Sequence, residues 1–150
     1  MATVRDVAAY ILAKEAPMSA MKLQKLCYFA YGYHLAWEDR QLFPERFEAW
    51  ANGPVVYELY DQHRGRFNLD KGDIVGDPTA LDDDERDSVN VVLESFRTYD
   101  AHELSAMTHQ PGPWLDARNR AGVTDLQRSN EELRDEEIAD FFGALVGRED

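Results

Sequence analysis

Cysteine, long apolar runs and positive charge are all scarce in this sequence. Cysteine occurs once in 150 residues, as Cys27, so no internal disulfide can form and a reducing compartment is expected. No apolar run approaches the roughly 18 residues of a membrane-spanning helix, and no basic-then-apolar leader precedes Thr3. A chain of this length can bury a core without disulfides. We therefore expect one domain over residues 1–150, cytoplasmic and without membrane contact.

Basic side chains are outnumbered by acidic ones, 16 to 29, which gives a net charge of −13. Neutralising phosphates requires a basic face, so direct nucleic-acid binding is not expected. The excess is uneven: residues 1–75 carry 9 basic and 10 acidic side chains, and residues 76–150 carry 7 and 19. Two interpretations stay open, a well-solvated surface and a field that steers a basic partner.

Catalytic motifs are also missing. The sequence has neither a phosphate-cradling glycine pattern nor a Gly-x-Ser-x-Gly nucleophile pattern. HELSAMTH (102–109) is superficially similar to a zinc-protease helix, but that motif needs a second histidine where Ala106 stands. Cys27 falls in an apolar helix, where burial keeps a thiol inert. We predict no enzymatic activity and no cofactor or metal; a small hydrolase or transferase using His109 or His63 is the less favoured alternative.

Helix start signals recur along the chain. Thr3, with Asp6 three residues later, begins a first helix that should stop near Ala16-Pro17. Ser19 begins a second, apolar on nearly every side through Trp37, which predicts a helix at the centre of the fold. Further helices are predicted to begin at residues 82–85, at Asp100 with Glu103, at Pro113-Trp114 and at Asp135.

The segment between these helices is less regular. Residues 47–50 are predicted to be extended, and Pro54 to occupy the first turn of a third helix that ends at Gly65. Residues 66–80 have no helical stripe and are expected to form a connection with at most a short strand. The predicted fold is mostly α: a single compact helical domain of about six or seven helices, with at most a short strand pair in the connections.

RFEAWANGPVVYELY (46–60) places a turn inside an aromatic and aliphatic run. Gly53 allows a turn at little steric cost, and Pro54 restricts the backbone after it. Trp50 and Tyr57 could then flank a rigid corner that displays the amide of Asn52, which suits a binding surface. In the alternative interpretation Trp50 belongs to the core and the turn has no further role.

Three stretches together resemble the Panacea domain, the SocA-like antitoxin family. They are MKLQKLCYFAYGYHLAW (21–37), LFPERFEAWANGPVVYELY (42–60) and ELSAMTHQPGPWLDAR (103–118). The positions that match the family pattern are Lys22 to Leu26, Glu48 to Trp50, Gly53 to Val55, Leu104, Thr108, His109, Pro113 and Trp114. LRDEEIADFF (133–142) resembles the family's terminal helix, so the resemblance covers nearly the whole chain.

The resemblance implies an α-helical antitoxin that neutralises a protein toxin, encoded by the adjacent gene, through direct contact. Family membership does not identify the toxin, and the chain lacks the basic extension with which some relatives bind DNA. A phage- or prophage-associated adaptor or regulator that binds another host protein is the alternative. The candidate partner-binding residues are Lys22, Lys25, Trp50, Asn52, Gly53, Pro54 and Tyr57. For the two lysines, pairing with carboxylates is an equally open interpretation.

Overall fold

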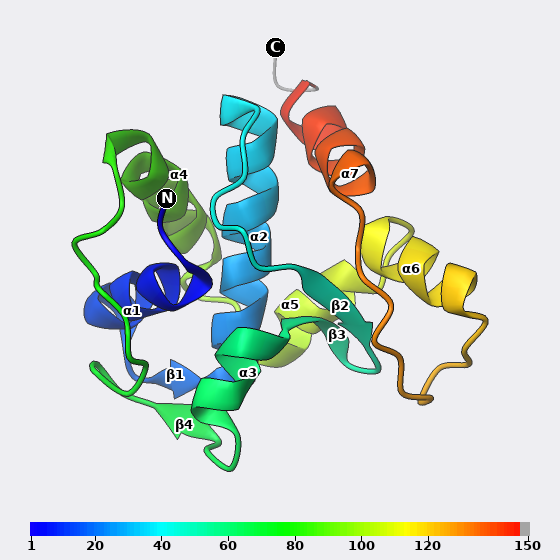
Figure 1. Ribbon diagram of the computed structural model, residues 1–150, viewed down its shortest axis with the longest axis horizontal. Coiled ribbons are helices and arrows are strands. Elements are labelled where there is room, and N and C mark those ends of the chain that lie inside the picture. Colours follow the sequence, from blue (N-terminus) through cyan, green and yellow to red (C-terminus); the bar gives the residue numbers. More distant parts are fainter. Residues whose placement is uncertain (148–150) are drawn as a thin grey trace.

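The computed structural model in Figure 1 describes residues 1–147 and is arranged around one long helix, α2 (Ala20–Glu38). Ser19 caps this helix by accepting a hydrogen bond from the Lys22 amide, as its sequence predicts. Side chains on every side of α2 are buried, Leu23, Cys27 and Phe29 among them. The central position predicted for this helix is confirmed.

Six shorter helices surround α2 and confirm the mostly α fold. In Figure 1, α1 and α4 lie on one side of α2 and α7 on the other, while α3, α5 and α6 lie toward its N-terminal half. Their bounds are α1 (Val4–Glu15), α3 (Tyr57–His63), α4 (Asp83–Phe96), α5 (Ala101–Thr108), α6 (Pro113–Ala121) and α7 (Asp135–Gly147). None of the helices within residues 1–147 has both the length and the apolar composition that crossing a membrane requires.

Local capping chemistry sets most helix starts. Thr3, Asp82 and Asp100 each form a full capping box with the residue three positions later, and Pro113 begins α6. These predictions are confirmed. Each depends only on side chains within one helical turn, so the sequence alone was enough to make them.

Asp135 has a different role from the predicted cap. It is the first residue of α7, and its carboxylate accepts hydrogen bonds from Tyr31 (2.7 Å), Gln41 (2.8 Å) and Arg46 (2.8 Å). Burial is the largest influence on this carboxyl, yet these three donors keep its pKa below the usual range. Asp135 therefore ties α7 to α2 and to the connection that follows α2.

The connections contain two antiparallel strand pairs, where the sequence suggested at most one. β1 (Met18–Ser19) pairs with β4 (Asn68–Leu69), the short strand expected within residues 66–80. β2 (Phe47–Trp50) pairs with β3 (Gly53–Val56), and this unit, residues 47–56, is the hairpin discussed below.

The prediction that Pro54 begins a helix was wrong. Pro54 lies in β3 opposite Ala49, and α3 begins only at Tyr57. Proline has no backbone N–H to donate. It is tolerated both in the first turn of a helix and in a short strand, so Pro54 by itself does not distinguish the two structures. Tertiary contacts decide between them: the Gln24 side chain hydrogen-bonds both the N–H and the carbonyl of Val56, which holds this segment extended.

Candidate functional site

The hairpin is held by side chains from three other parts of the chain. Five of its carbonyl groups accept a hydrogen bond from a side chain of α2, α5 or α6. The pairs are Arg118 to Ala49 (2.9 Å), Trp114 to Trp50 (2.8 Å), Ser105 to Asn52 (2.8 Å), Lys25 to Pro54 (3.4 Å) and Gln24 to Val56 (3.3 Å). At roughly 0.5–1.5 kcal/mol for each bond, this set fixes the shape and the placement of the hairpin.

Gln24 connects the hairpin to α3 as well as to α2. Its Oε1 accepts from the Val56 N–H (3.0 Å), and its Nε2 lies 3.1 Å from Nε2 of His63. Burial, together with the nearby charge of Lys25, lowers the pKa of His63, and a neutral imidazole nitrogen can accept the amide hydrogen. The three segments therefore meet in one buried polar cluster.

Lys25 is fully buried directly beneath the hairpin turn. Gly53 has a φ of 127°, and a Cβ atom there would lie 2.6 Å from Cε of Lys25 and 3.2 Å from Oγ1 of Thr108. Only glycine allows the turn and the lysine to approach this closely. Burial lowers the pKa of Lys25 to about 7.

Neither candidate lysine pairs with a carboxylate within residues 1–147. Nζ of Lys22 donates to the Arg97 carbonyl (2.9 Å), away from the hairpin, and Nζ of Lys25 donates to the Pro54 carbonyl. The ion-pair interpretation of these lysines was therefore wrong for the described part of the chain.

His109 and Trp114 lie beside the hairpin, on the side of α5 and α6. Their rings stack with centroids 4.1 Å apart, and the Arg118 guanidinium lies over the Trp114 ring at 5.3 Å. Partial burial, followed by the charge of Lys25, lowers the pKa of His109, which favours the neutral form of this ring.

Arg118 also positions the loop that precedes α7. Its guanidinium donates to the carbonyls of Thr124 and Gln127, both at 2.7 Å. Farther along, the Ala49 N–H donates to the Glu131 carbonyl (2.8 Å), so this segment runs beside β2. Residues 128–130 are thereby placed next to the tip of the hairpin.

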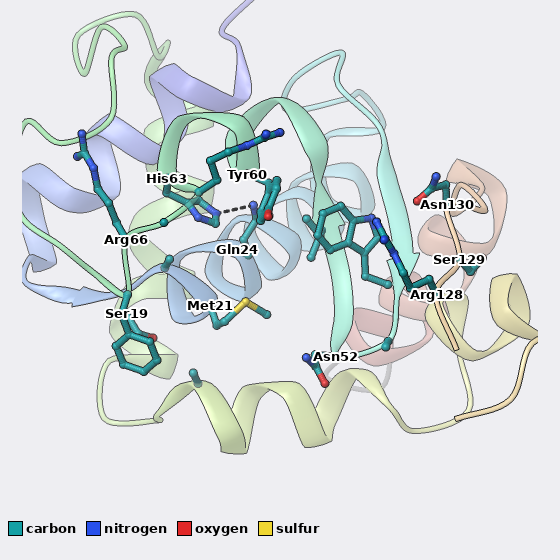
Figure 2. Close-up of a pocket in the computed structure, with 18 residues that line it drawn as sticks. Ser19, Met21, Gln24, Asn52, Tyr60, His63, Arg66, Arg128, Ser129 and Asn130 are labelled. Atoms are coloured by element: carbon teal, nitrogen blue, oxygen red, sulfur yellow. Dashed lines mark hydrogen bonds between the residues drawn. The ribbon is translucent and has the colours of Figure 1, made fainter. Parts of the chain in front are cut away.

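An open pocket of about 450 Å³, here called the hairpin pocket, lies against the hairpin tip (Figure 2). Its walls come from the start of α2, the hairpin tip, the end of α3 with the turn after it, the start of α5, and residues 128–130. Figure 2 shows Met21 in the middle, Arg66 at one end, and Asn52 with Arg128 at the other. Trp50 is half-buried here and packs edge-to-face on Tyr60, with centroids 4.9 Å apart.

The structure brings most of the candidate partner-binding residues to this region. Trp50 and Asn52 line the hairpin pocket, and Asn52 is exposed. Gly53, Pro54 and Lys25 are buried beneath the tip, so they can affect a partner only through the shape they give the hairpin.

Two candidates lie outside the pocket lining. Tyr57 is 44% exposed on α3, and its hydroxyl accepts a hydrogen bond from Arg64 (2.9 Å). Lys22 is partly exposed on the side of α2 that faces Arg97.

Sequence reasoning missed most of the residues that line the hairpin pocket, among them Met21, Phe67 and Arg128. Met21 directly precedes the Lys-Leu-Gln-Lys-Leu motif, and that adjacency was the available signal. Phe67 and Arg128 lie in irregular segments without a motif, and only the tertiary fold brings them to the hairpin.

The histidines do not form the arrangement that an acid–base enzyme would need. Nδ1 of His34 is 2.7 Å from the Ser88 hydroxyl in the buried core, His63 contacts Gln24, and His109 stacks on Trp114. No histidine within residues 1–147 makes a hydrogen bond or ion pair with a carboxylate. The same residues contain no cluster of three or more histidine, cysteine or acidic side chains suited to a metal ion.

Comparison with known proteins gives a consistent match. The family described as "Antitoxin SocA-like, Panacea domain" matches residues 23–115. The chain is 33% identical over 135 residues to Antitoxin SocA of Caulobacter vibrioides (strain NA1000 / CB15N), a match that covers 79% of this chain and 72% of that relative. No solved structure matches the chain significantly.

Proposed function

The chain belongs to the SocA-like Panacea antitoxin family, and from this premise we propose that it is the antitoxin of a toxin–antitoxin pair, which neutralises a protein toxin by direct binding. The observation that carries the proposal is the convergence of the family's three motifs on one hairpin. Gln24 and Lys25, Trp50 and Gly53, and Thr108 with Trp114 all lie at or beneath its tip.

This arrangement suits a binding surface because the hairpin is ordered before any partner arrives. A surface already fixed by five side-chain hydrogen bonds loses little conformational entropy on association. The half-buried Trp50 and the exposed Asn52 present an aromatic face and an amide beside an open apolar pocket. Aromatic side chains in such positions commonly supply much of the binding energy of an interface.

The proposed partner is a toxin encoded by the adjacent gene, encountered in the cytoplasm. Contact is with protein and not with nucleic acid, in keeping with the net charge of −13.

Co-expression with the product of the adjacent gene tests this function. We expect that product alone to stop growth, and this chain to restore growth and to co-purify with it. If the product is harmless alone, or stays toxic when this chain is present, the antitoxin proposal fails and the adaptor alternative is the one to test next.

The binding surface is tested by one small truncation. Asn52→Ala should raise the dissociation rate of the purified complex, because this exposed amide lies at the proposed interface. Asn119→Ala is the matched control, an exposed asparagine on α6 outside the pocket lining. Equal dissociation rates for the two variants would remove Asn52 from the interface.

A further inference from the structure

The hairpin pocket has a charge pattern opposite to that of the whole protein. The chain has 29 acidic side chains, yet no aspartate or glutamate among residues 1–147 lines the pocket. Three arginines do: Arg64, Arg66 and Arg128. The pocket is thus an apolar, locally basic site on a strongly acidic molecule.

Within residues 1–147, one of these three positive charges has no hydrogen-bond or ion-pair partner. Arg64 pairs with Asp61 (3.1 Å) and lies over the Tyr60 ring, and Arg66 pairs with Asp73 (3.6 Å). Arg128 is exposed and makes neither a hydrogen bond nor an ion pair with any residue in the described range, 1–147. The pocket therefore offers one uncompensated guanidinium, at the end nearest Asn52 (Figure 2).

The backbone around Arg128 is held in place. Arg118 donates a hydrogen bond to the carbonyl of Gln127, the residue before Arg128. The Ser129 hydroxyl, in the residue after it, accepts a hydrogen bond from the Glu131 N–H (3.1 Å). The Arg128 side chain therefore starts from a backbone that is held beside the hairpin tip, and Met21 lies in the middle of the same pocket (Figure 2).

We infer that the hairpin pocket binds a short segment of the partner protein that places apolar side chains over Met21 and Trp50 and one acidic side chain against Arg128. The inference rests on the proposed function, since it describes the part of the toxin that is recognised. A guanidinium at the edge of an apolar surface forms a charge-assisted hydrogen bond with a carboxylate. The acidic remainder of the surface repels acidic macromolecules in general, so a carboxylate is accepted at this one position.

A peptide segment fits these observations better than a nucleic acid does. A polyphosphate backbone requires several unpaired basic groups in a row, and the pocket supplies one. The apolar walls of the pocket suit apolar side chains of a peptide, and one carboxylate of the peptide would balance the charge of Arg128.

Selection from a library of displayed, short random peptides on the purified full-length chain tests this inference without the toxin. We expect the enriched peptides to combine large apolar residues with more aspartate and glutamate than lysine and arginine. Arg128→Glu should reverse that charge preference. Arg5→Glu is the control, an exposed arginine outside the pocket whose side chain also makes no hydrogen bond or ion pair within residues 1–147, and it should leave the preference unchanged.

Three outcomes would overturn the inference: no enrichment or no acidic preference in the wild-type selection, an unchanged preference in Arg128→Glu, or binding of a random single-stranded oligonucleotide pool that depends on Arg128. The toxin adds a second readout. Arg128→Glu should weaken its complex by about tenfold or more, since it places like charges together, whereas Arg5→Glu should not.

The failure of this inference can be told apart from the failure of the proposed function. If co-expression shows no neutralisation but the peptide selection behaves as expected, the antitoxin role falls, and the pocket still binds such a segment, which then belongs to a partner other than the toxin. If the toxin is neutralised and Arg128→Glu binds it as wild type does, the antitoxin role stands and the pocket inference falls.

Discussion

Lys25 is a cation in surroundings that disfavour its charge. It is fully buried, has no carboxylate partner within residues 1–147, and reaches only the Pro54 carbonyl at 3.4 Å. Burial therefore lowers its pKa to about 7. An isolated charge in this position costs stability, which the hairpin geometry offsets by packing the lysine stem beneath Gly53.

The first prediction is a pH dependence of stability that belongs to Lys25. Between its folded pKa near 7 and its ordinary value of 10.5, the unfolded chain binds a proton that the folded chain does not, so the free energy of unfolding should rise with pH. From pH 7 to about 8.5 the rise should be roughly 1–2 kcal/mol. Urea denaturation across this range measures it.

Lys25→Met is the matching variant, because it keeps the length of the side chain and removes the charge. We expect it to be more stable than wild type at pH 7 and to lack the rise. Above about pH 8.5 Cys27 acts in the opposite direction, and Tyr28 joins it near pH 10, because burial raises their pKa values and the unfolded chain ionises first. Parallel curves for the two proteins would show that Lys25 is not a buried, titrating cation.

At the scale of elements, the sequence predicts what local chemistry decides. Thr3, Ser19, Asp82 and Asp100 start helices through bonds within one turn, and each of these starts was predicted. β3 was not predicted, because Pro54 suits a helix start equally well and the choice is made by contacts with Gln24, far away in the sequence.

In the candidate site, too, features that depend on local sequence could be predicted and features that depend on long-range contacts could not. Trp50 and Asn52 could be singled out because a turn within an aromatic run is visible in the sequence. Phe67 and Arg128 could not, since five separate segments form the hairpin pocket and neither residue belongs to a motif. The burial of Lys25 was also beyond sequence reasoning, because a lysine is rarely buried without a partner.

The second prediction tests the close approach at the hairpin turn by comparing two glycines. Gly72 has a φ of 88° with open space around it, whereas Gly53 has a φ of 127° with Lys25 and Thr108 in the way. Gly72→Ala should cost roughly 1–2 kcal/mol, from backbone strain alone. Gly53→Ala should cost about 1–3 kcal/mol more, from the added overlap. Equal losses in chemical denaturation would show that the turn is not tightly packed.

At the scale of the whole molecule, the acidic surface has both structural and solvent-facing parts. Asp82 belongs to the first kind: it forms a capping box, pairs with Arg40 (3.1 Å), and has a pKa lowered chiefly by the Glu85 N–H. Asp87, Glu136 and Asp140 belong to the second kind, being exposed and without hydrogen bonds or ion pairs in the described range, 1–147.

The third prediction separates a solvated surface from a steering field. Neutralising Asp87, Glu136 and Asp140 to their amides should slow association with a basic toxin and flatten its salt dependence, with little change in dissociation. Stability should stay within about 1 kcal/mol, because none of these side chains makes a hydrogen bond or ion pair within residues 1–147 and Glu136 alone lies in the first turn of its helix. Unchanged association at low salt would favour the solvated-surface interpretation.

The central claim is that this member of the SocA-like family holds its partner at the hairpin pocket, and hydrogen exchange of the free chain and of its complex with the co-expressed product of the adjacent gene tests it most directly. We expect slower amide exchange in the complex at three segments that line the pocket: residues 51–52, 64–67 and 128–130. Exchange in α4, which contributes nothing to the pocket, should be unchanged. Protection confined to α4 or α7, with the three pocket segments exchanging as in the free chain, would contradict the account.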